Sequence, residues 1–244
     1  LYKFNLRSFF IQLLLNIMYY LFSVLGLLYA LEISTSLVRI AGYKLGTPET
    51  GIMLQSSMSL VSRALMFLFL PVVGFLADTS SIDISSMSIA IFIQIVPSIL
   101  VVINKSRLVN FFAIIIVNMN THGIISFKRN SPVTKKIKIK SKGMKYKSLI
   151  FYIFIGYIPL YLSYPLMLIL LDIMPNYRAT LLGSVSIINA INSVVVTLIL
   201  DPKLARIRSH MRLLENTYSN IIIVKLIVLF ICSSLFSLSL LIWL

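Results

Sequence analysis

The chain has 244 residues, of which 59% are apolar and 12% are charged, and its mean hydropathy is +0.97. These values exclude an ordinary soluble domain and predict an integral membrane protein whose surface faces mostly lipid. The net charge of +15 does not indicate nucleic acid as a partner, because cytoplasmic loops of membrane proteins are rich in lysine and arginine.

Apolar runs predict an all-α, polytopic helix bundle that forms a single integral membrane domain over residues 1–244. A helix needs about 20 apolar residues to cross a bilayer. Six spans are predicted, at Leu13 to Ala41, Ile52 to Ala77, Met87 to Ile103, Leu149 to Leu171, Leu181 to Leu200, and Ile221 to Leu244. The printed chain opens on Leu1 instead of Met, which predicts a missing start or an unusual start codon.

The segment between the third and fourth predicted spans, residues 104–148, is basic. Its stretch from Phe127 to Lys147 holds nine lysines and arginines and no acid. We expect this stretch on the cytoplasmic side, touching anionic lipid headgroups, with both chain termini outside. The apolar run from Leu108 to Ile125 is interrupted by Asn118 and His122, which favours an amphipathic interfacial helix over a seventh span.

Two short patterns predict helix starts. In Thr47-Pro48-Glu49, a hydroxyl cap precedes proline at the first helical position and an acid in the first turn. In the second pattern, we expect Asp201 to cap an interfacial helix that runs from Pro202 towards Tyr218.

Glu32, Arg39 and Arg63 are ionisable residues inside the first two predicted spans. A charge at bilayer depth costs roughly 2.5 to 3.5 kcal/mol, so it usually faces a polar cavity. Glu32 and Arg39 are seven residues apart and share a helix face. They could line a substrate cavity; alternatively, a neighbouring helix holds Glu32 while Arg39 reaches the cytoplasmic headgroups.

Arg63 has apolar neighbours on both sides and lies too deep to reach the headgroups easily. Gln55, Ser59 and Ser62 extend its polar face. Its planar guanidinium offers five hydrogen-bond donors that match phosphate geometry, so an anionic headgroup is a natural ligand. The alternative is an internal salt bridge with Glu32.

The fifth predicted span carries a stripe of small polar residues at steps of three or four. The stripe consists of Ser186, Asn189, Ser193, Thr197 and Asp201, with Asn192 beside it. Such a stripe serves either helix packing or a polar pathway. Arg178 precedes it and could meet an anionic group at the cavity or pair with Asp172.

Motifs of enzymes are missing from the sequence. It contains no His-Glu-x-x-His, no carboxylate-rich metal motif and no Walker lysine after a glycine loop. The single cysteine, Cys232, can build neither a disulfide framework nor a metal site. We therefore expect no enzymatic activity, no metal and no cofactor.

Three segments together resemble the Amj family of bacterial lipid II flippases. The first is Glu32 followed by Arg39-Ile40-Ala41-Gly42 and Lys44, with lysine in place of the family's last arginine. The second is Ser62-Arg63 with Pro71 eight residues after the arginine. The third comprises Tyr177-Arg178-Ala179-Thr180, Ile188-Asn189 and Asp201-Pro202. The resemblance covers roughly half of the chain, and Met66 and Phe69 are apolar where further polar residues are expected.

The resemblance implies movement of undecaprenyl-pyrophosphate-linked peptidoglycan precursor, lipid II, across the bacterial cytoplasmic membrane. Glu32, Arg39, Arg63, Arg178, Asn189, Asn192 and Asp201 are then the candidate cavity or substrate-binding residues. The expected partners are lipid II and anionic membrane lipids, without nucleic acid, and the oligomeric state stays open. A small ion-coupled solute transporter and a non-transporting membrane scaffold are the alternatives.

Overall fold

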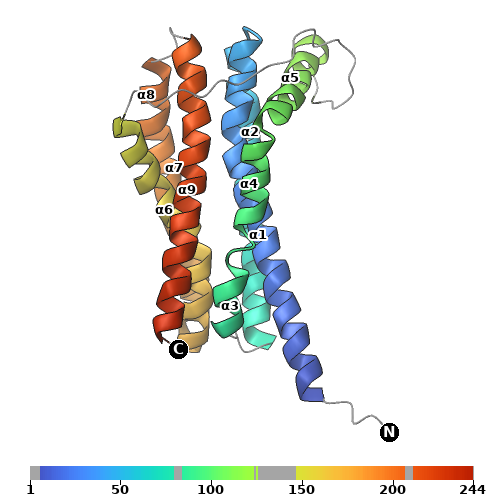
Figure 1. Cartoon of the computed structure of the whole chain (residues 1–244), viewed down its shortest axis with the longest axis vertical. Coiled ribbons are helices and arrows are strands. Elements are labelled where there is room, and N and C mark those ends of the chain that lie inside the picture. Colours follow the sequence, from blue (N-terminus) through green and yellow to red (C-terminus); the bar gives the residue numbers. More distant parts are fainter. Residues whose placement is uncertain (1–5, 80–83, 124, 126–146, 207–210, 244) are drawn as a thin grey trace.

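The computed structural model describes residues 6–79, 84–123, 125, 147–206 and 211–243. Within these residues every regular element is a helix (Figure 1), which confirms the predicted all-α class. The elements are α1 (Leu6–Lys44), α2 (Pro48–Thr79), α3 (Ile84–Ala90), α4 (Ile95–Ile103), α5 (Lys105–His122), α6 (Lys147–Ile173), η1 (Pro175–Tyr177), α7 (Arg178–Val195), η2 (Val196–Leu200), α8 (Asp201–Arg206) and α9 (Met211–Trp243).

Five helical stretches are long and apolar enough to cross a membrane, and a bent pair of helices could add a sixth. The five are Tyr19–Lys44, Pro48–Phe75, Ser148–Ile173, Pro175–Leu204 and Leu214–Ile242. The bent pair joins Met87–Ile103 to Lys105–His122 at an angle of 73°. The chain is therefore a multi-pass helix bundle, as its composition predicts.

The third predicted span is interrupted between α3 and α4 by a turn at residues 91–94. This turn packs against α1 at Gly26, where a Cβ atom would lie only 2.6 Å from the Cα of Gln94. The Gln94 side chain is buried, and its Nε2 donates to the Ser233 Oγ of α9 at 2.9 Å. The break is thus held between two neighbouring helices.

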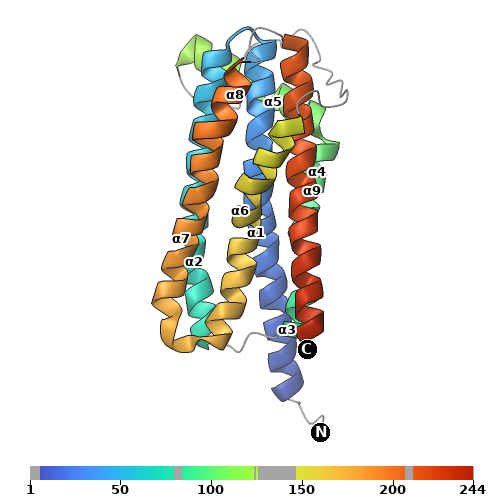
Figure 2. The same cartoon turned by 90° about the vertical axis from the view of Figure 1, so that its left-hand side faces the viewer.

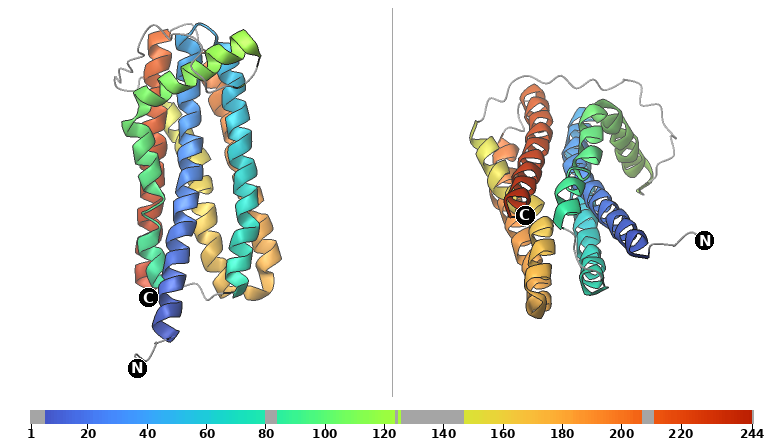
Figure 3. Two further views of the ribbon diagram at one scale, coloured as in Figure 1. Left: turned by 90° about the vertical axis from the view of Figure 1, so that its right-hand side faces the viewer. Right: turned by 60° about the horizontal axis from the view of Figure 1, so that its bottom comes forward.

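Helix α5 is bent by 73° relative to the α3–α4 pair that precedes it, and it crosses one end of the bundle (Figure 3). It begins at Lys105 and ends at His122, where Gly123 adopts a left-handed conformation (φ 67°). By length and composition α5 passes as part of a span only together with the preceding pair, and its position at the membrane interface stays a prediction. The basic stretch Phe127 to Lys147 lies outside the described residues, apart from Lys147 itself.

The predicted interfacial helix from Pro202 towards Tyr218 is wrong. Asp201 has helical backbone angles and continues the helix from α7 through the π-helical turn η2 into α8. The N–H of Asp201 bonds to the carbonyl of Val196, five residues back, so η2 shifts the hydrogen-bond register just before Pro202. A π-turn of this kind accommodates a proline that would otherwise disrupt the helix. Tyr218 lies inside α9.

The α1–α2 hairpin contains the first predicted helix start. Helix α2 begins at Pro48 with Glu49 in its first turn, as predicted, but the predicted hydroxyl cap is wrong, because the buried Thr47 Oγ1 has no hydrogen-bond partner among the described residues. Gly46 in the preceding turn has a positive φ of 74°, which glycine adopts without strain. The two helices touch at Gly42 and Gly51, where a Cβ on Gly42 would lie 2.7 Å from the Cα of Gly51.

The helices form two groups, α1–α5 and α6–α9 (Figures 1 and 3). Helix α9 packs against α1, α3 and α4 of the first group, whereas α2 meets α6 and α7. Helix α1 is central, with 78% of its most apolar stretch buried, compared with 22% for α2 and 17% for the α7–α8 stretch. The start of α1 and the end of α9 lie at one end of the bundle, and Lys44 and Lys203 belong to helix segments at the other (Figure 1).

Candidate functional site

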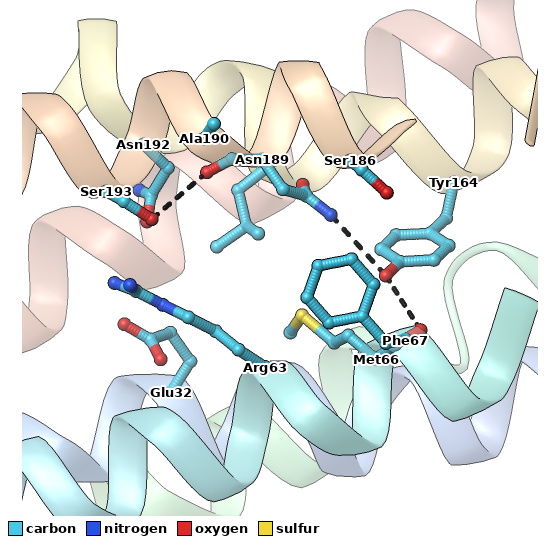
Figure 4. Close-up of a pocket in the computed structure, with 11 residues that line it drawn as sticks. Glu32, Arg63, Met66, Phe67, Tyr164, Ser186, Asn189, Ala190, Asn192 and Ser193 are labelled. Atoms are coloured by element: carbon cyan, nitrogen blue, oxygen red, sulfur yellow. Dashed lines mark hydrogen bonds between the residues drawn. The ribbon is translucent and has the colours of Figure 1, made fainter. Parts of the chain in front are cut away.

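A cavity of about 220 Å³ lies between α1, α2, α6 and α7 (Figure 4). Its polar lining consists of Glu32, Arg63, Ser186, Asn189, Asn192 and Ser193. Its apolar lining consists of Met66, Phe67, Leu160, Tyr164 and Ala190. One acid, one base and two amides thus meet in a space large enough for a small polar group.

Arg63 projects from α2 into this cavity, with its guanidinium on the same side as the Glu32 carboxylate (Figure 4). The residue is half-buried. Arg63 takes part in none of the ion pairs that the described residues form with one another. The alternative interpretation of Arg63, a direct salt bridge with Glu32, is therefore wrong, although the two charges remain close enough to interact. The guanidinium keeps its donors for another group.

Glu32 is buried on α1 and is contacted by other helices. The Tyr157 hydroxyl of α6 donates to its Oε1 at 3.5 Å. The buried Lys225 of α9 places its Nζ 3.4 Å from the Glu32 carbonyl oxygen and 3.3 Å from the Ser36 Oγ. The same Nζ lies 4.4 Å from the centre of the Tyr157 ring, a cation–π arrangement. Glu32 thus lines the cavity and is also held by neighbouring helices, so each of the two interpretations of the sequence describes part of its surroundings.

Arg39 belongs to a second cluster, and the structure does not place it among the residues that line the cavity. Its Nη2 lies 2.8 Å from Asp201 Oδ1 and its Nη1 donates to the Tyr218 hydroxyl at 2.7 Å. Arg39 is 8% exposed, so it does not extend outwards as a side chain reaching for headgroups would. Asp201, expected at the cavity, is its partner. The pair joins α1 to α8 beside the π-turn.

The polar stripe of α7 divides between the cavity wall and helix packing. Asn189 lines the cavity and its Nδ2 lies 3.4 Å from the Tyr164 hydroxyl (Figure 4). Asn192 also lines the cavity, but its Nδ2 donates to the carbonyl of Gly156 on α6 at 2.9 Å. Thr197 is exposed. Both interpretations of the stripe therefore describe part of it.

One end of the cavity is closed by an aromatic contact between α2 and α6. The Tyr164 hydroxyl donates to the carbonyl of Met66 at 3.1 Å, and its ring meets Phe69 edge to face at 5.6 Å. Beyond this contact, Arg178 forms an ion pair with Asp78 at the end of α2. The predicted alternatives for Arg178, the cavity or Asp172, are both replaced by this pair.

Lys225 and the tyrosines of α6 are parts of the site that sequence reasoning missed. Lys225 lies four residues inside the last predicted span, where a buried charge is as costly as at Arg63, and this signal was visible. Tyr157, Tyr161 and Tyr164 follow at steps of four and three, which places them on one helix face. That spacing could have marked α6 as a wall of the site.

No family model, curated protein or solved structure matches this chain. The resemblance to the Amj family therefore stays a prediction that depends on its short motifs. Among the described residues there is no group of three or more histidines, cysteines or carboxylates that could hold a metal ion.

Proposed function

We propose that this protein moves an amphiphile with a pyrophosphate head, lipid II, across the bacterial cytoplasmic membrane. The observation that carries the proposal is Arg63, a guanidinium in an intramembrane cavity that takes no part in the ion pairs between described residues. The identity of the lipid comes from the Amj resemblance. A non-transporting scaffold would have no use for such a cation at this depth.

The chemistry of the cavity suits an anionic head. Moving a phosphate out of water without compensation is prohibitive, and charge-assisted hydrogen bonds from an arginine replace part of the lost hydration. Asn189 and Ser193 line the same space on the opposite helix and offer amide and hydroxyl groups. Glu32 faces the arginine and disfavours a ligand of very high negative charge, because like charges repel.

The size of the cavity defines which part of lipid II it could hold. About 220 Å³ accommodates a pyrophosphate group but not the sugars and peptide attached to it. Passage of the whole head therefore requires α2 to move away from α6 and α7. The contacts to be released include the hydrogen bond from Tyr164 to the Met66 carbonyl and the ion pair of Arg178 with Asp78.

Complementation tests the proposal directly. The chain is expressed in bacteria depleted of their usual lipid II flippase, and growth is measured together with the amount of protein in membranes. Wild type should restore growth, whereas Arg63→Ala should not. Arg63→Lys should be impaired at normal abundance, because lysine keeps the charge but loses the planar bidentate fork.

Arg107→Ala is the matched control, since Arg107 is an exposed arginine on α5 outside the cavity. Full rescue by both Arg63 variants at normal abundance would remove Arg63 from the mechanism. Failure of the wild-type chain to restore growth at normal membrane abundance would contradict lipid II as the substrate.

An ion-coupled transporter of a small soluble anion is the second candidate. Two observations favour it: the cavity has the size of a small anion, and the helix pair α3–α4 is interrupted, as ion-binding helices of transporters often are. Proteoliposomes separate the two functions. Uptake of radioactive phosphate or pyrophosphate driven by an ion gradient would support the transporter, and gradient-independent movement of a fluorescent polyprenyl pyrophosphate would support the flippase.

A further inference from the structure

The cavity opens sideways between α2 and α7. Two of its lining residues, Phe67 of α2 and Ala190 of α7, are also exposed on the outside of the bundle, Phe67 by 53%. A residue can line the cavity and face outwards only if it stands at the mouth. Figure 2 shows α2 and α7 next to each other along this edge, and they are the two least buried spans.

The mouth differs in polarity from the inner end of the cavity. Glu32, on the central helix, is buried, whereas the surfaces beside the mouth are apolar and exposed. These flanking residues are Leu60 and Leu68 on α2 and Ile187, Ile191 and Val194 on α7. A ligand that fits this gradient has an anionic head and an apolar chain.

The opening lies part-way along the α2–α7 edge. Towards one end the two helices touch, because a Cβ on Gly74 would meet the Leu182 Cδ1 at 3.2 Å. Beyond that contact, Arg178 pairs with Asp78. The mouth at Phe67 and Ala190 is therefore separated from that end by a closed segment. Because Phe67 and Ala190 lie inside the candidate spans Pro48–Phe75 and Pro175–Leu204, we expect a chain leaving through the mouth to enter the hydrocarbon region.

We propose that the gap between α2 and α7 at Phe67 and Ala190 is a lateral portal that holds the hydrocarbon chain of a lipid whose phosphate or pyrophosphate head binds Arg63. This inference rests on one part of the proposed function, namely that Arg63 binds an anionic group. The chain stays in contact with the bilayer and with apolar side chains, so binding exposes none of it to water. The portal thereby selects lipid-linked anions over free ones.

Binding to the full chain in lipid nanodiscs tests the portal. Two probes are compared, inorganic pyrophosphate and farnesyl pyrophosphate, and binding to empty nanodiscs is subtracted. Wild type should bind farnesyl pyrophosphate at least tenfold more tightly than pyrophosphate. Ala190→Trp, which fills the mouth, should lower that ratio at least tenfold, and Ala190→Leu should lower it less.

Ala179→Trp is the matched control, because Ala179 is an exposed alanine on α7, as Ala190 is, but lies beyond the closed segment at Leu182 and does not line the cavity. It should keep the wild-type ratio. The portal is overturned if wild type binds farnesyl pyrophosphate and pyrophosphate with similar affinity. It is also overturned if neither Ala190 variant changes the ratio of the two affinities, which includes the case in which a variant weakens binding of both probes equally. If Arg63→Ala weakens the binding of neither probe relative to wild type, Arg63 is not an anion site, and the proposed function is contradicted as well. Pyrophosphate alone reports on that site, so the two failures are distinguishable.

Discussion

Glu32 lies on the most buried span and meets groups from three other helices. Tyr157 of α6 donates to its carboxylate, Lys225 of α9 lies against its carbonyl, and Arg63 of α2 faces it across the cavity. Lys225 is buried, and its Nζ is held by the Glu32 carbonyl and the Ser36 hydroxyl. The ion pairs between described residues do not join it to the Glu32 carboxylate, so we expect this acid to offset the Lys225 charge at longer range. Arg63, which borders the open space, is then left for a ligand.

Replacing Lys225 with methionine tests this division of roles. The variant keeps the length and apolar stem of the side chain but removes the buried cation near Glu32. We expect Lys225→Met to lower the free energy of unfolding by about 3 kcal/mol, because a buried charge loses its compensation. The double variant Lys225→Met with Glu32→Gln should recover most of that loss. Thermal unfolding of the purified protein in detergent measures both.

Arg107→Ala provides the reference for loss of an exposed cation and should change stability by less than about 0.5 kcal/mol. If the losses of Lys225→Met and Glu32→Gln simply add in the double variant, the two residues do not compensate each other.

The residues of the cavity were partly predictable. Arg63 and Glu32 stood out because charge inside an apolar run is rare, and Asn189 stood out because its neighbours repeat at helical spacing. Arg39 and Asp201 are also polar residues in spans, but they form their own pair at 2.8 Å. Sequence spacing identifies residues on one helix face, whereas the partner of each residue depends on which helices become neighbours.

At the scale of helices, the α1–α2 hairpin depends on a contact between two glycines. A Cβ at Gly42 would lie 2.7 Å from the backbone of Gly51, so neither helix could keep its place. We expect Gly42→Ala to destabilise the protein by about 1–3 kcal/mol through this clash. Thermal unfolding in detergent, with the amount of protein in membranes, is the measurement.

Gly183→Ala is the matched control, since Gly183 lies inside α7 and a Cβ there would meet no atom within 4 Å. Alanine favours helix over glycine, so this variant should be as stable as wild type or gain up to about 1 kcal/mol. Equal unfolding temperatures for the two variants would show that the hairpin tolerates the extra atom.

Helix starts and apolar runs were easier to predict than helix interruptions. The start at Pro48 follows from local backbone chemistry, because proline fits the first turn of a helix. The break at residues 91–94 precedes Pro97, which cannot donate to the Ile93 carbonyl, and it packs closely against Gly26 of α1. Asp201-Pro202 carries a local start signal that the preceding π-turn overrides. Contacts between distant segments help to decide such places.

At the scale of the whole molecule, the two helix groups are joined more firmly on one side than on the other. On one side, α9 is hydrogen-bonded through Ser237 to the Ser88 carbonyl and through Ser233 to Gln94. On the other side, α2 and α7 meet at Gly74 and Leu182 and through the partly exposed ion pair of Arg178 with Asp78. Movement of the groups about α9 would therefore open the α2–α7 edge first.

A disulfide across that edge should stop transport. In a Cys232→Ala background, cysteines replace Gly74 and Leu182, and complementation is compared under reducing and oxidising conditions. We expect activity in the reduced form and its loss on oxidation, because the helices can no longer separate.

A cysteine pair at Ser88 and Ser237 is the control and should keep its activity when oxidised. Transport by the oxidised Gly74 and Leu182 pair at full cross-linking would show that the α2–α7 edge does not open there.

The distribution of lysine and arginine between the two ends of the bundle predicts how the molecule is oriented in the membrane. The turn between α6 and α7 lies at the end where α9 terminates, and α5 crosses the opposite end, where Lys44 and Lys203 are found (Figures 1 and 3). Because cytoplasmic loops carry the excess of lysine and arginine, α5 should lie inside and the turn outside.

Cysteine labelling in intact cells checks this orientation at two exposed positions, His122 at the end of α5 and Asn176 in η1. In the Cys232→Ala background, an impermeant maleimide should modify Asn176→Cys in intact cells and His122→Cys only after the cells are opened. A cysteine at Lys138, in the basic stretch outside the described residues, should behave like the one at His122. Labelling of His122→Cys but not of Asn176→Cys in intact cells would show that the bundle has the opposite orientation in the membrane. In that orientation, Arg39 and Asp201 would lie nearer the outer surface and the Arg178–Asp78 pair nearer the inner surface. A lipid arriving from the cytoplasmic leaflet would then meet the α2–α7 contact at Arg178 and Asp78 first, so this contact would have to open first.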